Sequence, residues 1–310
     1  MDVSIKSTTN SKINLKIKGK HVNHTTVNTL RRIILSEVPS YGISTDNIFI
    51  EKNTSIYDND IMRSRISMLP IPKMMNDIDY YNNYNNDDDD NKSDKQIDIY
   101  LNVINDTKDI MNVTTNDYKV LVNGEEIKNP YDQKKPSLVI RLKPEQEFSF
   151  RAVAEIGIAK NHDLWAVASP CYYKELEEDN YEFIFETLGQ MGHKEILTKA
   201  CTVVIKKLEN IENMIKSNYN DPSLDKVKKI YLTLENENHT MGNLITYALQ
   251  DQKNVLYAGF KKDHLLIDEI NIRLETTTYN PLKTFFETTT KLKGVFMDTK
   301  NNITKLNYKK

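Results

Sequence analysis

Apolar residues recur at helical spacing in two stretches of the chain that share a short motif. Residues 24–37 read HTTVNTLRRIILSE, with aliphatic side chains spaced by threes and fours from Val27 to Ile34 and with Pro39 just beyond. The first seven residues of this stretch return as HTMGNLI at 239–245. Such spacing, with polar residues where a helix begins and proline after its end, predicts two related amphipathic helices.

Strands with alternating apolar residues accompany both helices. One is expected before each helix, at 13–17 and 230–234, and another follows Asp46 and Asp268, where both copies read D-x-I-x-I. Two matched segments in the same order favour an internal repeat over a chance likeness between short amphipathic helices.

Each copy also contains a longer helix. Apolar residues step by threes and fours from 197 to 215 and again after Pro281, the spacing of a helix that packs against another helix. Pairing these helices would bury both seams around a pseudo-two-fold axis, with about 1.5–3 kcal/mol for each fully buried large apolar side chain. The side chains expected in this internal seam are Val27, Leu30, Ile34, Leu197, Cys201, Val204, Leu208, Ile211, Leu244, Leu282, Phe285, Leu292 and Phe296.

A β-rich insert is expected in the first copy. Its strand patterns lie at 97–103, 119–122, 138–142 and 148–153. An Asn123-Gly124 pair indicates a tight hairpin turn within it. Residues 76–95 are of low complexity and contain four consecutive aspartates, Asp87 to Asp90. These could hold a magnesium ion in an enzyme, but their Asn- and Ser-rich setting without apolar anchors favours a solvated loop.

These patterns predict an α+β fold with two related dimerisation units, which the resemblance described below implies to be alpha-like. Each unit is an antiparallel sheet plus helices, and a pseudo-two-fold axis pairs the units. The expected boundaries are 1–65 and 151–217 for the two parts of the first unit, 66–150 for the insert, 218–225 for a linker and 226–310 for the second unit.

Composition and charge narrow the possible functions. The chain carries 42 Lys and Arg against 44 Asp and Glu, whereas a domain that grips duplex DNA usually has a strong basic excess. No apolar run approaches the roughly 20 residues of a membrane-spanning helix, and the first residues lack the apolar core of a signal peptide. We therefore expect an intracellular protein that contacts no membrane.

No residues have the spacing of a catalytic or metal site, and no cofactor is expected. The 6 histidines lack metal-ligand spacing with carboxylates, and Cys171 and Cys201 are expected to be reduced and buried. His24 and His239 each begin a repeat helix, where they are expected to help cap or pack the helix start, with the threonine that follows as the cap. Gly242 is expected to permit close helix packing.

Several segments resemble one known family. Residues 28–43, NTLRRIILSEVPSYGI, resemble the first helix of the third-largest subunit of eukaryotic RNA polymerase II, a motif shared with its archaeal counterpart and with the bacterial alpha amino-terminal domain. Residues 141–165, RLKPEQEFSFRAVAEIGIAKNHDLW, resemble the return from the insert to the dimerisation domain. The second copy, 234–277, is similar to the small eleventh subunit, with NVLYAGFKKDH at 254–264 as a specific marker. The chain thus resembles a fusion of both subunits, and such fused forms suggest a large DNA virus.

The resemblance implies a non-catalytic subunit that serves as an assembly platform and docks the largest and second-largest polymerase subunits. Small accessory subunits are further expected partners, DNA is contacted only through the complex, and no homo-oligomer is expected. Its place would be the host cytoplasm and the virion if viral, or the nucleus if cellular. The resemblance places Arg31 and Arg32 at a large-subunit contact, with Arg63 and Arg65 as further candidates, although solvated helix arginines would look the same. Cellular relatives often bind zinc through insert cysteines, but residues 66–150 contain no Cys, so no zinc is expected.

One alternative comes from another functional class. A free-standing nucleic-acid-binding transcription regulator would use the basic residues of the tail and of the long helix. These residues are Lys206, Lys207, Lys305, Lys309 and Lys310. Such a regulator predicts salt-sensitive DNA binding by the isolated protein.

Overall fold

The computed structural model describes residues 1–72, 74, 95–219 and 226–306, and its contacts divide the chain into two compact units. Unit 1 comprises Met1–Leu35, Pro170–Glu186 and His193–Lys310, and unit 2 comprises Ser36–Ser169 and Thr187–Gly192. Both repeat helices belong to unit 1, and the β-rich insert belongs to unit 2. Within the described ranges, no helix is long and apolar enough to cross a membrane.

The first half of unit 1 is a four-stranded sheet with two helices. The sheet has the strand order β1-β2-β12-β11, and β2 pairs antiparallel with both β1 and β12. Alternating Ile13, Leu15 and Ile17 of β2 are all buried, as the sequence predicts. Its elements are β1 (Asp2–Thr8), β2 (Lys12–Lys18), α1 (His24–Ser36), β11 (Ala168–Glu177), β12 (Asn180–Thr187) and α3 (His193–Asn218).

The second half repeats this plan with fewer strands. Its antiparallel sheet has the order β13-β15-β14, and it contains one short and one long helix. Its elements are β13 (Lys229–Glu235), α4 (His239–Gln250), β14 (Val255–Lys261), β15 (Glu269–Thr276) and α5 (Pro281–Thr304). The order of strand, short helix and long helix is shared, as the sequence predicts. The expected match between the two D-x-I-x-I strands is wrong, because the first, β4 (Ile48–Asn53), pairs with β10 (Glu147–Gly157) in unit 2, whereas the second, β15, is the central strand beside β13. The strand of the first half that pairs as β15 does is β12.

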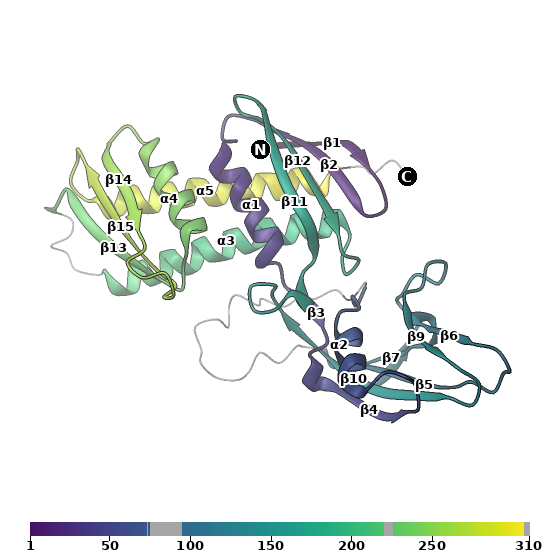
Figure 1. Cartoon of the computed structure of the whole chain (residues 1–310). Coiled ribbons are helices and arrows are strands. Elements are labelled where there is room, and N and C mark those ends of the chain that lie inside the picture. The colour runs from purple at the N-terminus through teal and green to yellow at the C-terminus, as the bar shows by residue number, and fades with distance from the viewer. Residues whose placement is uncertain (73, 75–94, 220–225, 307–310) are drawn as a thin grey trace. The chain divides into compact units, whose positions relative to one another are not determined.

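The long helices α3 and α5 lie side by side along unit 1 (Figure 1). They run antiparallel, because Lys194 at the start of α3 donates to the carbonyl of Thr304 at the end of α5, whereas Glu212 contacts Thr289 in the first half of α5. In addition, α3 packs on β13 and α5 packs on β1. Each half thus supplies a long helix to the sheet of the other, which is the arrangement that a pseudo-two-fold pairing predicts.

Unit 2 is built on a six-stranded sheet with the order β3-β10-β5-β7-β8, in which β4 also pairs with β10. The described elements are β3 (Ser40–Gly42), β4 (Ile48–Asn53), α2 (Asn59–Ser67), β5 (Ile97–Ile104), β6 (Met111–Thr114), β7 (Lys119–Val122), β8 (Glu125–Ile127), β9 (Leu138–Leu142) and β10 (Glu147–Gly157). Asn123 and Gly124 both have positive φ, 52° and 84°, and join β7 to β8 by the two-residue turn that their sequence predicts.

The unit boundaries differ from the expected domain boundaries. Strands β3 and β4 pair with β10, and α2 packs on β4, so residues 36–65 group with the insert and not with the first dimerisation unit. The expected limits at 66 and 150 are therefore displaced to 36 and 169. Residues 76–94 of the expected loop and 220–225 of the expected linker lie outside the described residues, and the aspartate run lies with them.

Candidate functional site

The two repeat helices of unit 1 contact each other through corresponding ends. The imidazole of His24 in α1 packs edge-on against Tyr247 in α4, with ring centroids 5.1 Å apart. At the other end, Arg32 Nε donates to Thr240 Oγ1 over 2.7 Å. In the repeat, His24 corresponds to His239 and Arg32 to Tyr247, so the two contacts are near-equivalents related by the pseudo-two-fold axis.

Between these contacts lies a small polar pocket of about 140 Å³. Its lining residues are His24, Thr25, Asn28, Thr29 and Arg32 from α1, and His239, Thr240 and Asn243 from α4. Three residue types of this lining, His, Thr and Asn, occur at equivalent positions of both helices. The sequence identified the motif but not the pocket, because the two copies stand more than two hundred residues apart in the chain.

The long-helix seam is apolar and deeply buried. All thirteen side chains expected in the internal seam are buried, and the largest of them, Phe285 and Phe296, have no exposed surface. Burial of Leu197, Leu208 and Ile211 on one side of α3 follows from their spacing by threes and fours.

A polar cluster that sequence reasoning missed crosses this seam. Glu212 of α3 accepts a hydrogen bond from Thr289 Oγ1 over 2.7 Å and pairs with Lys293 Nζ at 2.8 Å, both from α5. Lys207 of α3 lies 3.2 Å from Glu237, and both side chains of this ion pair are buried. All three contacts join α3 to residues of the second half, so they constrain how the two halves align.

Arg31 and Arg32, the first two candidate interface residues, both lie on α1. The Nε of Arg31 donates to Asn28 Oδ1 over 2.9 Å, and that of Arg32 reaches Thr240. Arg31 is half-buried, whereas Arg32 is exposed. One of the two arginines therefore links the halves of unit 1, a role that the sequence did not reveal.

Arg63 and Arg65 lie on α2 of unit 2. Arg63 donates to the Ile48 carbonyl over 3.3 Å and to Asp60 over 2.9 Å. Arg65 donates through Nε and Nη2 to two successive carbonyls of β9, with the bond to Val139 at 2.7 Å. Both guanidinium groups thus fasten α2 to neighbouring strands.

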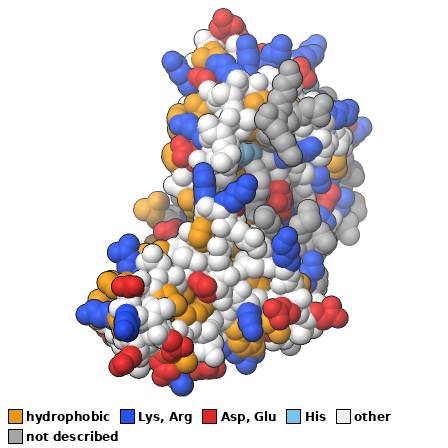
Figure 2. Space-filling view, turned by 90° about the vertical axis from the view of Figure 1, so that its right-hand side faces the viewer, with side chains coloured by type: hydrophobic (Ala, Val, Ile, Leu, Met, Phe, Trp, Pro, Cys, Tyr) orange, Lys and Arg blue, Asp and Glu red, His pale blue; other side chains and the backbone are white. Residues whose placement is uncertain are grey.

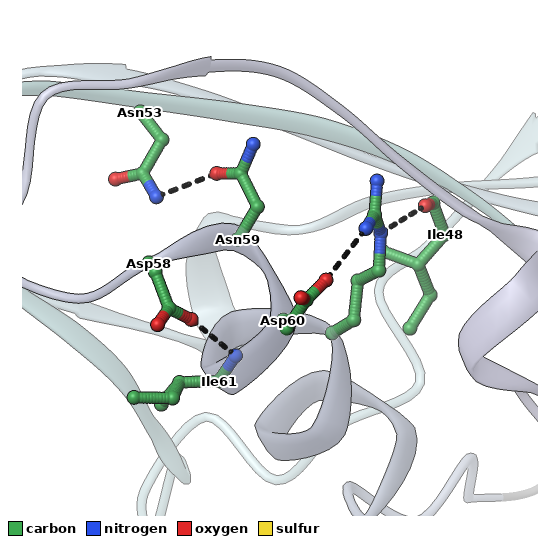
Figure 3. A network of polar contacts seen from close by, with 7 residues as sticks. Ile48, Asn53, Asp58, Asn59, Asp60 and Ile61 are labelled. Atoms are coloured by element: carbon green, nitrogen blue, oxygen red, sulfur yellow. Dashed lines mark hydrogen bonds and ion pairs between the residues drawn. The ribbon is translucent and has the colours of Figure 1, made fainter.

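The segment from β4 to α2 presents apolar side chains from a tightly bonded loop. Asn53 Nδ2 donates to the Tyr57 carbonyl and to Asn59 Oδ1, and Asp58 caps α2 by accepting from the Ile61 N–H over 2.8 Å, as Figure 3 shows for the pairs it labels. The exposed large apolar side chains of this segment are Phe49, Ile56, Tyr57, Ile61 and Met68. A rigid loop that exposes large apolar groups is typical of a protein-contact surface.

Two local expectations need correction. The caps of the repeat helices are Asn23, whose Oδ1 accepts from the Thr26 N–H, and Asn238, whose Oδ1 accepts from the Thr240 N–H, and not the threonines that follow His24 and His239. Each asparagine stands just before its helix, where its side-chain oxygen reaches the free N–H groups two or three residues later, whereas the threonines already lie within the helices. Gly242 does allow a close approach, but a Cβ there would meet the ring of Phe260 on β14 at 2.8 Å, so it faces a strand and not a helix.

The two cysteines are buried and free, as expected. Burial raises the pKa of the Cys171 thiol and that of the Cys201 thiol to about 12 each. Both thiols are therefore protonated and unreactive at neutral pH.

Two of the lysines expected to bind nucleic acid in the alternative function lie beside glutamates of this chain. Lys207 is buried in its ion pair with Glu237, and Lys206 lies 3.9 Å from Glu209. Figure 2 shows one face of the molecule, on which basic and acidic side chains are interspersed. Among the described residues, no three His, Cys, Asp or Glu side chains come together as a metal site.

Comparison with known proteins agrees with the repeat. A family model described as the RNA polymerase Rpb3/Rpb11 dimerisation domain matches residues 16–208, and a second model of the same description matches 229–302. The matched ranges run from β2 to α3 and from β13 to α5. They contain the two halves that pack together in unit 1, and the first range also contains the residues of unit 2.

The chain is also similar over most of its length to viral polymerase proteins. A protein of Acanthamoeba polyphaga mimivirus, named as DNA-directed RNA polymerase subunit R470, is 30% identical over 287 residues, which is 83% of this chain and 80% of that protein. The DNA-directed RNA polymerase RPB3-11 homolog of African swine fever virus is 21% identical over 80% of this chain and 76% of its own length. The polymerase subunit Rpo3 of Methanocaldococcus jannaschii is 28% identical over 59% of this chain and 81% of its own. This chain belongs to the RNA polymerase Rpb3/Rpb11 dimerisation-domain family and contains both copies of the domain in one polypeptide.

Proposed function

We propose that this chain is a non-catalytic assembly platform of a multisubunit DNA-directed RNA polymerase. The observation that carries the proposal is the packing of two dimerisation domains of one family into a single body, through α3 and α5. The archaeal Rpo3 relative aligns with 59% of this chain and 81% of its own length, whereas the viral relatives align with most of this chain. Viral relatives that match most of the chain support a viral source, with the virus factory and the virion as sites of action.

The largest and second-largest polymerase subunits are the proposed partners of this platform, and small accessory subunits would join them. The first proposed docking surface is the edge of α1 with Arg31 and Arg32. A guanidinium suits a partner carboxylate, because its planar fork can donate two parallel hydrogen bonds. DNA would be held by the assembled complex and not by this chain alone.

A second proposed docking surface is the β4–α2 segment of unit 2. Phe49, Ile56 and Ile61 are more than half exposed, at 57%, 68% and 51%, on a loop and helix that internal hydrogen bonds hold in place. Covering such side chains would contribute about 25 cal/mol per Å² of apolar surface removed from water. Arg63 lies on the same helix and remains a candidate contact, whereas Arg65 is assigned mainly to holding β9.

Joining both domains in one chain changes how the pair forms. A short linker holds the second domain at an effective concentration on the order of millimolar, so pairing does not depend on meeting a partner chain. A homodimer would pair through the faces of α3 and α5, which are already packed against each other within one chain. We therefore expect a monomer when the protein is pure.

Affinity purification from infected or expressing cells tests this function. The tagged chain is expected to recover two very large subunits in near-equal amounts, whereas a free regulator would recover nucleic acid alone. Arg31→Ala and Arg32→Ala should each lower recovery of the second-largest subunit. Arg273→Ala on β15 serves as the matched control, because this exposed arginine pairs with Glu275 and stacks on Tyr257 within its own sheet. Unchanged recovery in both α1 variants would reject the assignment of those arginines.

A further inference from the structure

The pocket between α1 and α4 has the chemistry of an anion site. Arg32 supplies a permanent positive charge, and the other lining side chains are imidazoles, amides and hydroxyls, with no carboxylate among the eight. A cation would find only neutral oxygen and nitrogen atoms beside a guanidinium, which repels it. A negatively charged group is therefore the favoured occupant.

The hydroxyls of Thr25 and Thr29 donate to Asn23 Oδ1 and to the Thr25 carbonyl, so the donors left for a ligand belong to other lining side chains. Asn28 Oδ1 accepts from Arg31, so the NH₂ of that amide remains as a donor. Thr240 Oγ1 accepts from Arg32, so its hydroxyl proton can point elsewhere. The same two bonds hold Asn28 and the guanidinium in fixed positions, as a binding site requires.

Both histidine rings of the pocket are also held by aromatic partners. His24 packs edge-on against Tyr247 across the helix pair, and His239 packs against Phe260 of its own half at 5.6 Å between centroids. The two imidazoles therefore line the pocket from opposite helices. Because the donors come from both repeat copies, a bound anion would tie the two halves together.

The size of the pocket limits the ligand. Its volume of about 140 Å³ is roughly ten times the 10–15 Å³ that one water needs. It is well below the roughly 300–1,000 Å³ of sites for drug-sized molecules and cofactors. A carboxylate group or a small inorganic oxyanion fits this space, and a nucleotide base with its sugar does not.

We propose that this pocket binds a single oxyanionic group, of the carboxylate or phosphate type, and that the anion bridges the two fused halves. In the polymerase, an acidic side chain of a docked large subunit would supply the carboxylate, a source that rests on the proposed function. A free inorganic oxyanion would satisfy the same donors.

Titration of the pure, full-length protein with inorganic phosphate tests the site. We expect saturable shifts of the His24 and His239 ring resonances in NMR spectra, and no such shifts with sodium chloride at matched ionic strength. Arg32→Gln should weaken phosphate binding at least tenfold, and Asn243→Leu, which fills the pocket and keeps the arginine, should abolish it. Arg273→Gln should bind like the wild type, and circular dichroism shows whether each variant is folded.

Two results would overturn the proposal: wild-type ring resonances that do not respond to phosphate, or an unchanged response in folded Asn243→Leu. Recovery of large subunits by Asn243→Leu then separates the two sources. Lost recovery supports a carboxylate from a docked subunit, and full recovery supports a free oxyanion. Failure of the wild type to recover any large subunit would reject the proposed function and leave the phosphate result standing.

Discussion

Replacing Phe285 by alanine tests whether the α3–α5 seam holds the two halves of unit 1 together. The Phe285 side chain lies on α5 with no exposed surface. Removing a buried phenyl ring loses its transfer free energy and leaves a cavity, at a cost of about 3–5 kcal/mol. The adjacent Phe286 serves as a comparison for burial, because its ring also reaches α3, 5.5 Å from Lys216 Nζ, but is only half-buried. Its loss should cost about 1–2 kcal/mol.

Thermal unfolding followed by the helix signal in circular dichroism measures the difference. Four of the five described α-helices belong to unit 1, so this signal reports mainly on that unit. For a body of this size each kcal/mol lowers Tm by about 2–4 °C, which gives a fall of about 6–20 °C for Phe285→Ala and about 2–8 °C for Phe286→Ala. Equal falls in the two variants would refute the reasoning that the fully buried ring contributes more to the stability of unit 1 than the half-buried one.

Three further changes have expected outcomes. Asn238→Ala should lower the free energy of unfolding of unit 1 by about 1 kcal/mol in urea, because it removes the cap of α4. Asn238→Asp should keep the wild-type stability, and an equal loss in both variants would reject the capping role. Arg65→Ala should destabilise unit 2 by about 1 kcal/mol, because it removes the hydrogen bonds to two β9 carbonyls. Arg65→Lys should be destabilised to a similar extent, since an ammonium group cannot reproduce the planar fork of the guanidinium. Wild-type stability of Arg65→Lys would show that only the charge matters. The folded pKa of Cys171 and of Cys201 is raised to about 12 from an ordinary value near 9, so their contribution to stability is complete below pH 9 and is lost as the pH rises toward 12. The Tm of the wild type should therefore fall more steeply above pH 9 than that of the double variant Cys171→Ala, Cys201→Ala, and parallel curves would contradict the raised values.

Helices and core strands of the molecule could be predicted because their periodicity is strong. Both repeat helices and both long helices were expected within a few residues of their observed ends, since burial of one face imposes spacing by threes and fours. The D-x-I-x-I pattern also predicted strands, with Ile48, Ile270 and Ile272 buried and Ile50 half-buried, although the two strands lie in different units. The resemblance of these segments to a polymerase family is confirmed by both family matches.

Edge strands escaped prediction because packing imposes little pattern on them. Strand β1 lies at one edge of the four-stranded sheet and buries none of its side chains fully. Strand β11 lies at the other edge, where Pro170 is tolerated since an edge strand need not donate on both sides. The strand β14 is also an edge, and Leu256 and Tyr257 on it are exposed.

The polar parts of the candidate site depend on contacts between distant residues, which one sequence does not reveal. Arg32 and Thr240 stand 208 positions apart, and the Glu212 cluster joins helices 77 positions apart. Sequence reasoning placed Arg32 on the outer surface of a helix, which is correct, but its bond to the second copy follows only from the fold. Arg65 was expected to serve an outside partner, whereas the structure shows it bound to β9.

The central claim is that one chain replaces a dimer of separate subunits in a polymerase. Native mass spectrometry of the complex purified through this chain measures that directly. We predict one copy of this chain together with one copy of each of two large subunits. Two copies of this chain in the complex, or a complex without large subunits, would contradict the account.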